Sequence, residues 1–398
     1  MEVSSDGGTA GVEIVPVQWQ RMTLVELAGG RKDLFDDGDW IESEHITTTG
    51  VRLIQTGNIG VGAYVEKEAK KYIYEASFSS LRCKPLELGD LLICRLADPA
   101  GRACVLPDLG EAKVVTSVDV TIFRPPLGLA DRVYLCNVFS TAAWFRAVAD
   151  RSGGTTHKRI SRGALGRISV VLPPIEEQRA IAAALSDVDA LLAGLDRLIA
   201  KKRDLKQAAM QQLLTGQTRL PGFQGDWEVK RLGDIGPLQR GFDLPSPVLR
   251  PGQYPVVYSN GVLAHHDAYQ ARGPGVVTGR SGTIGRVSFI AEGPYWPHNT
   301  ALWVTSFKAN DPKFVFYLYT HIGFERFASG SGVPTLNRND AHAFEIAVPA
   351  TKDEQTAIAT VLSDMDTELT ALEARREKTR ALKQAMMQEL LTGRTRLV

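Results

Sequence analysis

The sequence contains no long apolar run. None of its 398 residues lies in a stretch of about 18 or more apolar residues, the length that a membrane-spanning helix requires. The N-terminal residues also lack the basic region and the apolar core of a signal peptide. We therefore expect a cytoplasmic protein, and we interpret the small and polar residues 1–12 as a disordered leader.

Cysteine is scarce as well. The chain has four cysteines, and their spacing fits no metal site, so we expect reduced, structural thiols. They are Cys83, Cys94, Cys104 and Cys136. The adjacent pair His265 and His266 lacks the further ligands that a metal site needs. We predict neither a metal nor a cofactor.

Catalytic motifs are also missing. We find no Walker A loop, no Pro-Pro-aromatic motif of amino-methyltransferases and no cluster of metal-nuclease carboxylates, so no catalytic residue is predicted. The formal net charge is +1, which neither indicates nor excludes a nucleic-acid partner. A DNA-binding surface would have to be a local basic patch.

What the sequence does contain is a long repeat. Glu177–Leu220 recurs without a gap as Glu354–Leu397, with more than half of the positions identical, which indicates an internal duplication. Apolar residues recur at steps of three and four, so each copy predicts one long helix with a single apolar stripe. The stripe residues are Leu185, Val188, Leu192, Leu195 and Ile199 in the first copy and Leu362, Met365, Leu369, Leu372, Leu382 and Met386 in the second.

The ends of these helices are marked. Thr351 and Glu354 have the spacing of a capping box, and Gly216 and Gly393 stand where a glycine commonly ends a helix. A helix over Glu177–Leu214 would be about 57 Å long. Its stripe must be buried, either against its own domain or, as we expect, against the other copy. Two arginines interrupt the second stripe, so an ideal unbroken coiled coil is not expected; they are Arg375 and Arg376.

The segments outside the helices have another pattern. Short apolar runs alternate with glycine turns and predict strands, for example at residues 51–55, 90–94, 114–115, 118–123 and 168–172. Val133–Val148 predicts one core helix. The fold class expected is α+β. The predicted order is a leader at 1–12, a first domain at 13–173, a helix at 174–221, a second domain at 222–349 and a helix at 350–398.

The two domains share their ends and differ in their middles. Gly275–Arg286 in the second corresponds to Leu92–Arg102 in the first. If the second helix packs on the first, the two must be antiparallel, and the chain acquires a pseudo-two-fold axis. Two similar modules on a stiff spacer suit a two-part linear target, and double-stranded DNA is the natural candidate.

Several short motifs, taken in order, are similar to those of a known family. They are Val51–Ile59, Gly89–Ile93, Pro173–Gln178, Pro255–Gly261, Gly279–Arg286, Ser329–Asn337 and Glu354–Ile358. No single motif is specific, but their order, twice over, is. Over nearly its whole length the chain resembles the specificity (S) subunits of type I restriction-modification systems.

The resemblance implies two target-recognition domains, each reading one half of a split DNA site. It implies spacer helices that form a coiled coil and dock methyltransferase (M) subunits, with restriction (R) subunits as further partners. It also implies that the chain itself catalyses no reaction. The segment Arg151–Arg162 is more basic than its counterpart at Ser331–Arg338, so we expect the two domains to hold phosphates unequally.

Candidate DNA-binding residues fall into three groups. Donors of the kind that contact phosphates are Arg151, His157, Lys158, Arg159 and Arg162, matched by Thr335, Asn337 and Arg338. Arginines beside glycine loops, which can read guanine, are Arg95, Arg102, Arg280 and Arg286. Tyr258 and Asn260 lie in a turn and could contact base edges. The alternatives are a solvated basic turn for the first group and structural ion pairs for the second.

Some polar residues are identical in both helix copies and are not explained by the apolar stripe. We predict that they contact partner subunits; they are Lys206, Gln207 and Gln211, with the copies Lys383, Gln384 and Gln388. Two other functions stay open at this point. One is a methyltransferase or nuclease with built-in recognition, and the other is a coiled-coil adaptor that binds only protein.

Overall fold

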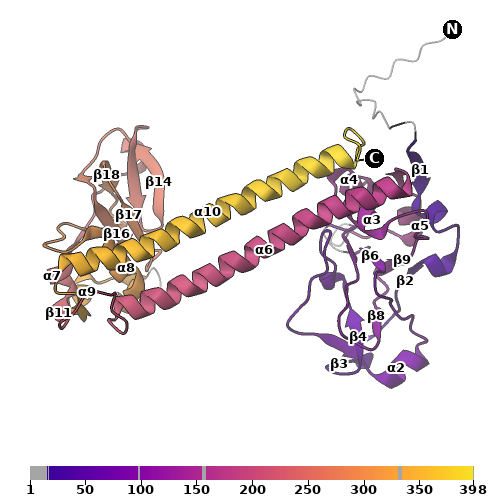
Figure 1. Ribbon diagram of the computed structural model, residues 1–398, viewed down its shortest axis with the longest axis horizontal. Coiled ribbons are helices and arrows are strands. Elements are labelled where there is room, and N and C mark those ends of the chain that lie inside the picture. The colour runs from indigo at the N-terminus through magenta and orange to yellow at the C-terminus, as the bar shows by residue number, and fades with distance from the viewer. Residues whose placement is uncertain (1–15, 17, 97–98, 155–157, 330–333, 398) are drawn as a thin grey trace, which may run out of the picture. The chain divides into compact units, whose positions relative to one another are not determined.

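The computed structural model describes residues 16, 18–96, 99–154, 158–329 and 334–397 (Figure 1). The predicted leader at 1–12 and the candidate His157 lie outside these residues. Contacts divide the chain into two units, Met1–Ala193 with Glu377–Val398, and Gly194–Arg376. No helix in the described part of the chain combines the length and apolar character needed to cross a membrane.

The two predicted long helices are present as α6 (Ile175–Leu214) and α10 (Lys352–Leu390). The backbone N–H of Glu354 donates to Thr351 Oγ1 over 3.4 Å at the start of α10. Gly216 and Gly393 adopt φ values of 72° and 73°, the left-handed conformation that ends a helix at low cost for glycine. The two glycine ends and the threonine half of the capping box are therefore confirmed, whereas the Glu354 carboxylate pairs with Arg219 instead of completing the box.

In unit 1 the start of α6 and the end of α10 pack together. Ile181, Ala182 and Leu185 share a core cluster with Leu390, and Asp189 pairs with Lys383 over 2.6 Å. The cluster also contains residues of the domain, so the stripe is buried against both its own domain and the other helix. Residues further along α6 contact residues earlier in α10, so the two helices are antiparallel.

Unit 2 repeats this arrangement with the helices exchanged. Leu213 and Leu214 of α6 lie in one cluster with Ile358 and Leu362 of α10. Ion pairs join the exposed edges of the two helices; they are Asp196–Arg376, Lys202–Glu368, Arg203–Glu373 and Lys206–Asp366. The sequence prediction of an antiparallel helix pair is confirmed.

One stripe residue was placed wrongly. Leu382 is 55% exposed, whereas Thr379 is 8% exposed and Met386 is half-buried against the unit 1 core. The side chains of Thr379, Lys383 and Met386, at steps of four and three, face inward, and Leu382 is left on the outer face. Counting apolar residues alone missed this because the inward position is occupied by threonine.

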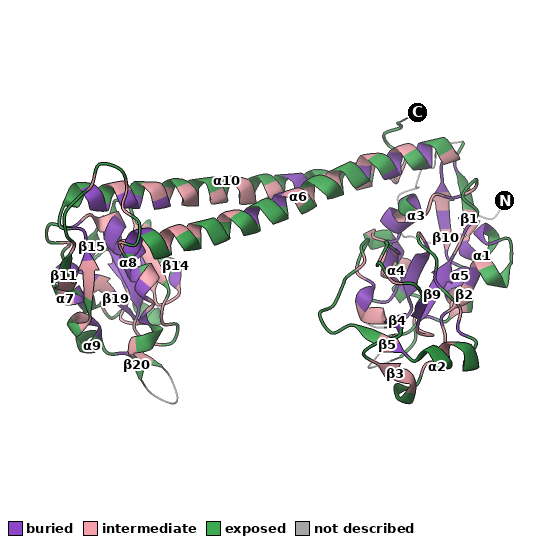
Figure 2. Ribbon diagram, turned by 60° about the horizontal axis from the view of Figure 1, so that its bottom comes forward, coloured by how far each residue is buried: buried purple, intermediate pink, exposed green. Residues whose placement is uncertain are grey.

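Unit 1 contains three sheets and five short α-helices within its described residues (Figure 2). The sheets are β1 (Gln20–Thr23) with β10 (Ser169–Leu172); β2 (Phe35–Asp37), β9 (Val120–Phe123), β6 (Leu91–Cys94) and β7 (Ala103–Val105); and β3 (Ile46–Thr47), β5 (Lys71–Ile73), β4 (Val51–Ile54) and β8 (Val114–Thr116). The helices are α1 (Leu24–Leu27), α2 (Glu75–Ser80), α3 (Arg132–Val138), α4 (Ala142–Ala149) and α5 (Arg162–Gly166). The predicted strands are all present.

The single core helix predicted at Val133–Val148 is wrong, because two helices, α3 and α4, occupy this segment. Thr141 is the N-cap of α4, and its Oγ1 accepts from the backbone N–H of Trp144 over 3.3 Å. Ser140 Oγ donates to the carbonyl of Cys136 over 2.8 Å. These hydroxyls satisfy the backbone groups at the break, so the chain can turn without losing apolar periodicity.

Unit 2 has the same framework. Its sheets are β11 (Glu228–Arg231) with β22 (Glu345–Val348); β12 (Leu238–Arg240), β19 (Ala301–Val304), β16 (Gly275–Gly279) and β17 (Val287–Ile290); β14 (Gly261–His266), β13 (Tyr254–Tyr258), β18 (Pro294–Pro297) and β15 (Ala271–Arg272); and β20 (Ala328–Ser329) with β21 (Thr335–Leu336). The helices are α7 (Leu232–Ile235), α8 (Pro312–Ile322) and α9 (Arg338–Ala343).

The two frameworks share their main topology and differ at one sheet edge and in the short β20–β21 sheet, which has no counterpart among the described strands of unit 1. The parallel pair β4–β8 of unit 1 corresponds to the parallel pair β13–β18 of unit 2. The outermost strand is β3, beside β5, in unit 1, but it is β15, beside β18, in unit 2. The domain middles therefore differ in structure as well as in sequence.

Candidate nucleic-acid interface

The structure brings the candidate loops of each unit together through the same backbone hydrogen bonds. In unit 1 the N–H of Ile160 donates to the carbonyl of Arg95 over 3.0 Å, and in unit 2 the N–H of Leu336 donates to that of Arg280 over 2.8 Å. Each arginine also donates its own backbone N–H to a third segment of its unit. Arg95 donates to the carbonyl of Asp119 over 2.8 Å, and Arg280 donates to the carbonyl of Thr300 over 2.9 Å. Segments far apart in sequence thus meet at one place in each unit.

The glycine loops also match. The N–H of Cys94 donates to the carbonyl of Arg102 over 2.8 Å, and the N–H of Gly279 donates to that of Arg286 over 3.3 Å. Arg95 and Arg280 therefore occupy equivalent positions in the two units, and so do Arg102 and Arg286, as the sequence comparison predicted.

Arg95 does not face solvent. It is 4% exposed, and its guanidinium donates to the carbonyls of Ile160 and Val118, over 3.1 and 2.5 Å, and lies 3.0 Å from Asp37. A side chain with these partners holds three segments together and cannot reach a base edge. The ion-pair alternative describes Arg95, and we leave it out of the proposed interface.

Two further arginines also bind the protein's own backbone. Half-buried Arg102 donates to the carbonyl of Thr56 over 3.3 Å, and partly buried Arg280 donates to that of Asn299 over 3.4 Å. Arg286 is different, because it is exposed and its guanidinium lies against Gly261. A Cβ on Gly261 would come within 3.1 Å of Arg286 Nη2, so the glycine leaves room for this arginine.

The basic segment of unit 1 has two kinds of cation. Arg159 is paired with Asp119 over 2.7 Å, and Arg162 is paired with Asp36. Exposed Arg151 donates to the carbonyl of Ala147 over 2.9 Å, and no acid among the described residues forms an ion pair with it. Lys158 is exposed as well. The net positive charge of the segment is therefore concentrated at Arg151 and Lys158.

In unit 2 the remaining candidates lie at the end of β13 and in the turn after it, and in the segment from β21 into α9. Tyr258 stacks on His298 with ring centroids 4.2 Å apart, and Asn260 lies in the turn itself. Thr335 belongs to β21 and forms a bridge with Ser281 of the glycine loop. Asn337 Oδ1 caps α9 by accepting from the N–H of Asn339 over 3.0 Å, and Arg338 comes next on the surface. The cap leaves the amide NH₂ of Asn337 available to a ligand.

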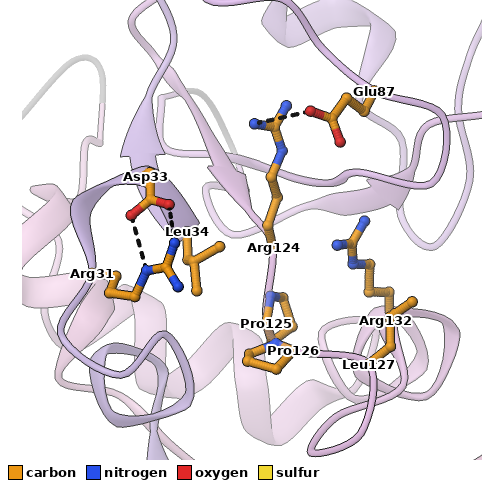
Figure 3. Close-up of a pocket in the computed structure, with 9 residues that line it drawn as sticks. All are labelled: Arg31, Asp33, Leu34, Glu87, Arg124, Pro125, Pro126, Leu127 and Arg132. Carbon is orange, nitrogen blue, oxygen red and sulfur yellow. Dashed lines mark hydrogen bonds and ion pairs between the residues drawn. The ribbon is translucent and has the colours of Figure 1, made fainter.

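The hollow drawn in Figure 3 has a volume of about 450 Å³, and arginines are prominent in its wall. Each arginine is paired with an acid. Arg31 lies 2.6 Å from Asp33, and Arg124 lies 2.6 Å from buried Asp90. Arg132 contacts the same Asp90 at 3.6 Å, and Glu87, 3.8 Å from Arg124, supplies the third acid. Because these pairs cancel one another's charge, the hollow is not a phosphate site.

The partner-binding candidates on the helices divide in two. The amine of Lys206 pairs with Asp366, and that of Lys383 pairs with Asp189. These lysines join α6 and α10, so we remove them from the proposed docking surface. The four glutamines of the set remain exposed; they are Gln207, Gln211, Gln384 and Gln388. Two exposed leucines are near them in the sequence, Leu205 at 47% and Leu382 at 55%, but residues two apart on a helix do not share a face, so these leucines lie outside the glutamine face.

No group of three or more His, Cys, Asp or Glu within the described residues could hold a metal ion. The four cysteines are free and buried. Burial raises the pKa of the Cys104 and Cys136 thiols to about 12, so both are thiols rather than reactive thiolates at neutral pH. His266 is buried and its ring contacts the backbone of Arg250, which accounts for it without a metal.

Comparison with known proteins identifies the family. The chain matches the family described as "Type I restriction modification DNA specificity domain" over residues 98–201 and 224–381, together more than half of the sequence. The chain belongs to this family. Members are specificity subunits, which recognise DNA as part of a restriction-modification complex and have no catalytic role. This supports the interpretation made from the sequence over both alternatives, the enzyme and the protein-binding adaptor.

Individual specificity subunits agree with this assignment. The putative type I restriction enzyme MjaX specificity subunit of Methanocaldococcus jannaschii is 25% identical over 67% of this chain and 68% of its own length. The crystal structure of the S subunit from M. genitalium superposes with a TM-score of 0.62 at 16% identity, covering 94% of this chain and 96% of that one. A structure from a study of complex assembly in a type I system gives a TM-score of 0.58 at 16% identity, covering 95% and 98%.

Proposed function

We propose that each unit of this specificity subunit reads one half of a bipartite site in double-stranded DNA. The observation that carries the proposal is the shared loop framework. Identical backbone hydrogen bonds hold the loops in both units, yet the exposed side chains on them differ. A protein that reads two different half-sites needs the same support and different contacts, because phosphate contacts position the protein and base contacts specify sequence.

We assign the exposed cations to phosphates. In unit 1 these are Arg151 and Lys158, with Arg159 and Arg162 at the same rim, and in unit 2 they are Arg286 and Arg338. Tyr258, Asn260, Thr335 and Asn337 supply hydroxyl and amide groups that can contact bases or backbone. Binding through these cations would weaken steeply with salt, since each neutralised phosphate releases condensed counterions.

We propose that α6 and α10 set the spacing between the half-sites and dock the catalytic subunits. Gln207 and Gln211 of α6 are one turn apart and share one exposed face of the helix, and their copies Gln384 and Gln388 share the equivalent face of α10, so they form two equivalent exposed patches. Exposed glutamines can donate and accept hydrogen bonds across a protein interface. Two equivalent patches suit two copies of one methyltransferase subunit, and restriction subunits would join that complex. We also propose a cytoplasmic location, where the cell's DNA and these subunits meet.

The test is the methylated motif produced by the complex of this chain with its methyltransferase subunits. Sequencing of modified bases should show two short half-sites separated by unspecified bases. Replacing residues 223–349 with the equivalent domain of a relative should change one half-site and leave the other as it was. A change in both half-sites, or a continuous motif, would contradict the proposal.

The spacing can be tested with the same readout. Inserting four helical residues beside Gly194 lengthens α6 by about 6 Å and rotates the C-terminal part of the helix by about 40°. The half-sites should then be separated by one or two more bases, with their sequences unchanged. An active variant that keeps the original separation would exclude the helices as the spacer.

A further inference from the structure

A second hollow in unit 1 lies beside the basic segment and is lined by none of the candidate DNA-binding residues named from the sequence. Its volume is about 430 Å³. It is lined by the turns after β2, β4 and β6, by the turn before β9, and by one lysine from the segment after β4. The lining residues are Asp39, Trp40, Ile41, Gln55, Thr56, Gly57, Lys67, Leu96, Ser117, Val118 and Asp119.

This hollow shares its wall with the candidate phosphate contacts. Leu96 forms a backbone bridge with Arg159, and Asp119 is paired with the Arg159 guanidinium over 2.7 Å. Arg102 donates to the carbonyl of Thr56, which is one of the lining residues. A duplex whose backbone rests on the basic segment would therefore present its grooves to this hollow.

The side chains here suit bases. Trp40 is 69% exposed, and its Nε1 donates to Glu42 over 3.1 Å, which orients the ring. Lys67 extends over Gly57, where a Cβ would lie 2.1 Å from its Nζ. Half-buried Gln55 completes the set. Lysine donates to guanine, glutamine pairs bidentately with adenine, and an exposed indole packs on a base or sugar.

Unit 2 has the same backbone at this place. The N–H of Ser117 donates to the carbonyl of Ile54 over 3.2 Å, and the N–H of His298 donates to that of Val257 over 2.9 Å. A parallel bridge joins Asp39 to Ser117, and its counterpart joins Phe242 to His298.

These matches give a residue-by-residue correspondence. Trp40, Gln55, Gly57 and Ser117 of unit 1 stand where unit 2 has Asp243, Tyr258, Asn260 and His298. Every one of these positions changes its chemistry although the backbone bonds between them are kept. Core packing does not explain these changes in side-chain chemistry, because most of these side chains are not fully buried.

We propose that this hollow is the base-reading surface of unit 1, with Trp40, Gln55 and Lys67 as specificity-determining residues. The equivalent surface of unit 2 uses Tyr258 and Asn260. The proposal rests on the proposed function, that each unit reads one half-site of double-stranded DNA. It adds which side chains of unit 1 distinguish bases, none of which belongs to the basic segment.

The experiment measures binding of the complex with its methyltransferase subunits to a DNA library randomised in both half-sites. Gln55→Ala and Lys67→Ala should each lower base discrimination about tenfold or more at one or two positions of the unit 1 half-site. Gln55→Glu, which keeps the side-chain size, should move the preference at its position towards cytosine, whose amino group donates to a carboxylate. The unit 2 half-site should stay unchanged in every variant, which also verifies folding.

Lys158→Ala is the matched control from the basic segment. It should weaken all sequences equally and make the salt dependence shallower by about one ion, as loss of a phosphate contact does. If the Gln55 and Lys67 variants behave like this control, or keep the original preference, the assignment of the hollow is wrong. If the unaltered complex shows no bipartite preference, the proposed function itself fails, and this outcome is distinct from the first two.

Discussion

In unit 1, Glu177 at the start of α6 accepts hydrogen bonds from Trp19, over 3.2 Å, and from Arg396, over 2.7 Å. In unit 2, Glu354 at the start of α10 accepts from Trp227 and Arg219 over 3.4 and 2.7 Å. We call each set a helix–domain joint. Arg219 lies just beyond α6 and Arg396 just beyond α10, so each joint ties the end of one long helix to the start of the other.

A second shared contact lies one residue further on. The carboxamide of Gln178 accepts from the N–H of Asp131 over 2.8 Å, and that of Gln355 accepts from Asp311 over 2.9 Å. Each acceptor is buried, and each aspartate caps a helix of the domain. The hollow of unit 1 has no such match, because Trp40 and Gln55 are replaced by an acid and a tyrosine.

The joints are the same in both units and the hollow is not, because the two places are under different physical constraints. Buried polar groups need their partners, since an unpaired one costs far more than a paired one contributes. The joints therefore tolerate little change. Exposed loop side chains carry no such penalty, so they are free to differ between units. Substitutions at the joints, along the helices and at the histidines of unit 2 test whether burial, and not sequence repetition alone, decides which residues must stay the same.

The largest effect should come from breaking a joint. Arg219→Ala leaves Glu354, whose side chain is 4% exposed, without its charged partner. We expect the free energy of unfolding of unit 2 to fall by about 3–5 kcal/mol. Denaturant unfolding with a probe in unit 2 measures it. Arg203→Ala removes the exposed pair with Glu373 and should cost about 1 kcal/mol or less. Equal effects would mean that burial does not distinguish the joint.

Two equivalent buried leucines should give a somewhat smaller loss of stability, of similar size in the two units. Leu185 and Leu362 are equivalent in the repeat, and both are 0% exposed. Leu185→Ala in unit 1 and Leu362→Ala in unit 2 should each cost about 2–5 kcal/mol, through lost burial and the cavity left behind.

The outer leucines provide the matched control for that pair. Leu205→Ala and Leu382→Ala should change stability by no more than about 0.5 kcal/mol. If the docking proposal is right, both should still bind methyltransferase subunits in a pull-down or by calorimetry, whereas Gln207→Ala and Gln384→Ala should weaken that binding. Equal binding by all four variants would contradict the proposed docking patches, and a loss of stability in the leucine variants would place these leucines in the fold.

The smallest effect is a pH-dependent change in stability that we expect in unit 2. Burial is the main cause that lowers the pKa of His298, His321 and His342, and all three belong to unit 2. These histidines stay neutral in the folded state while the unfolded chain binds protons below about pH 6.5. These three histidines should therefore lower the stability of unit 2 as the pH drops below that value, and they should leave it unchanged above that value.

Hydrogen exchange resolved by peptide, at pH 7.5 and 5.5, measures this after correction for intrinsic rates. His342→Asn should reduce the effect. The neutral Nε2 of His342 accepts from the N–H of Leu238 over 2.8 Å, and a protonated ring cannot accept that bond. Equal loss of protection in both units would show that the histidines are not responsible.

Much of this organisation could be predicted from local patterns. The duplication, both long helices and the glycines that end them depend on spacing within one segment, and the structure confirms them. Residues such as Leu382 and the break at Thr141 were missed, because periodicity cannot tell an inward threonine from an outward leucine, nor one helix from two that share a stripe.

The segments that lie at the candidate interface could be predicted from the sequence, since the Gly-Arg loops and the Arg151–Arg162 segment do meet there. The role of each side chain depends on the folded structure. Arg95 is buried because three distant segments converge on it, Lys206 is held by Asp366 of the other helix, and Trp40 with Lys67 forms a hollow. Burial and pairing depend on residues far away in the chain, and no pattern within one segment records them.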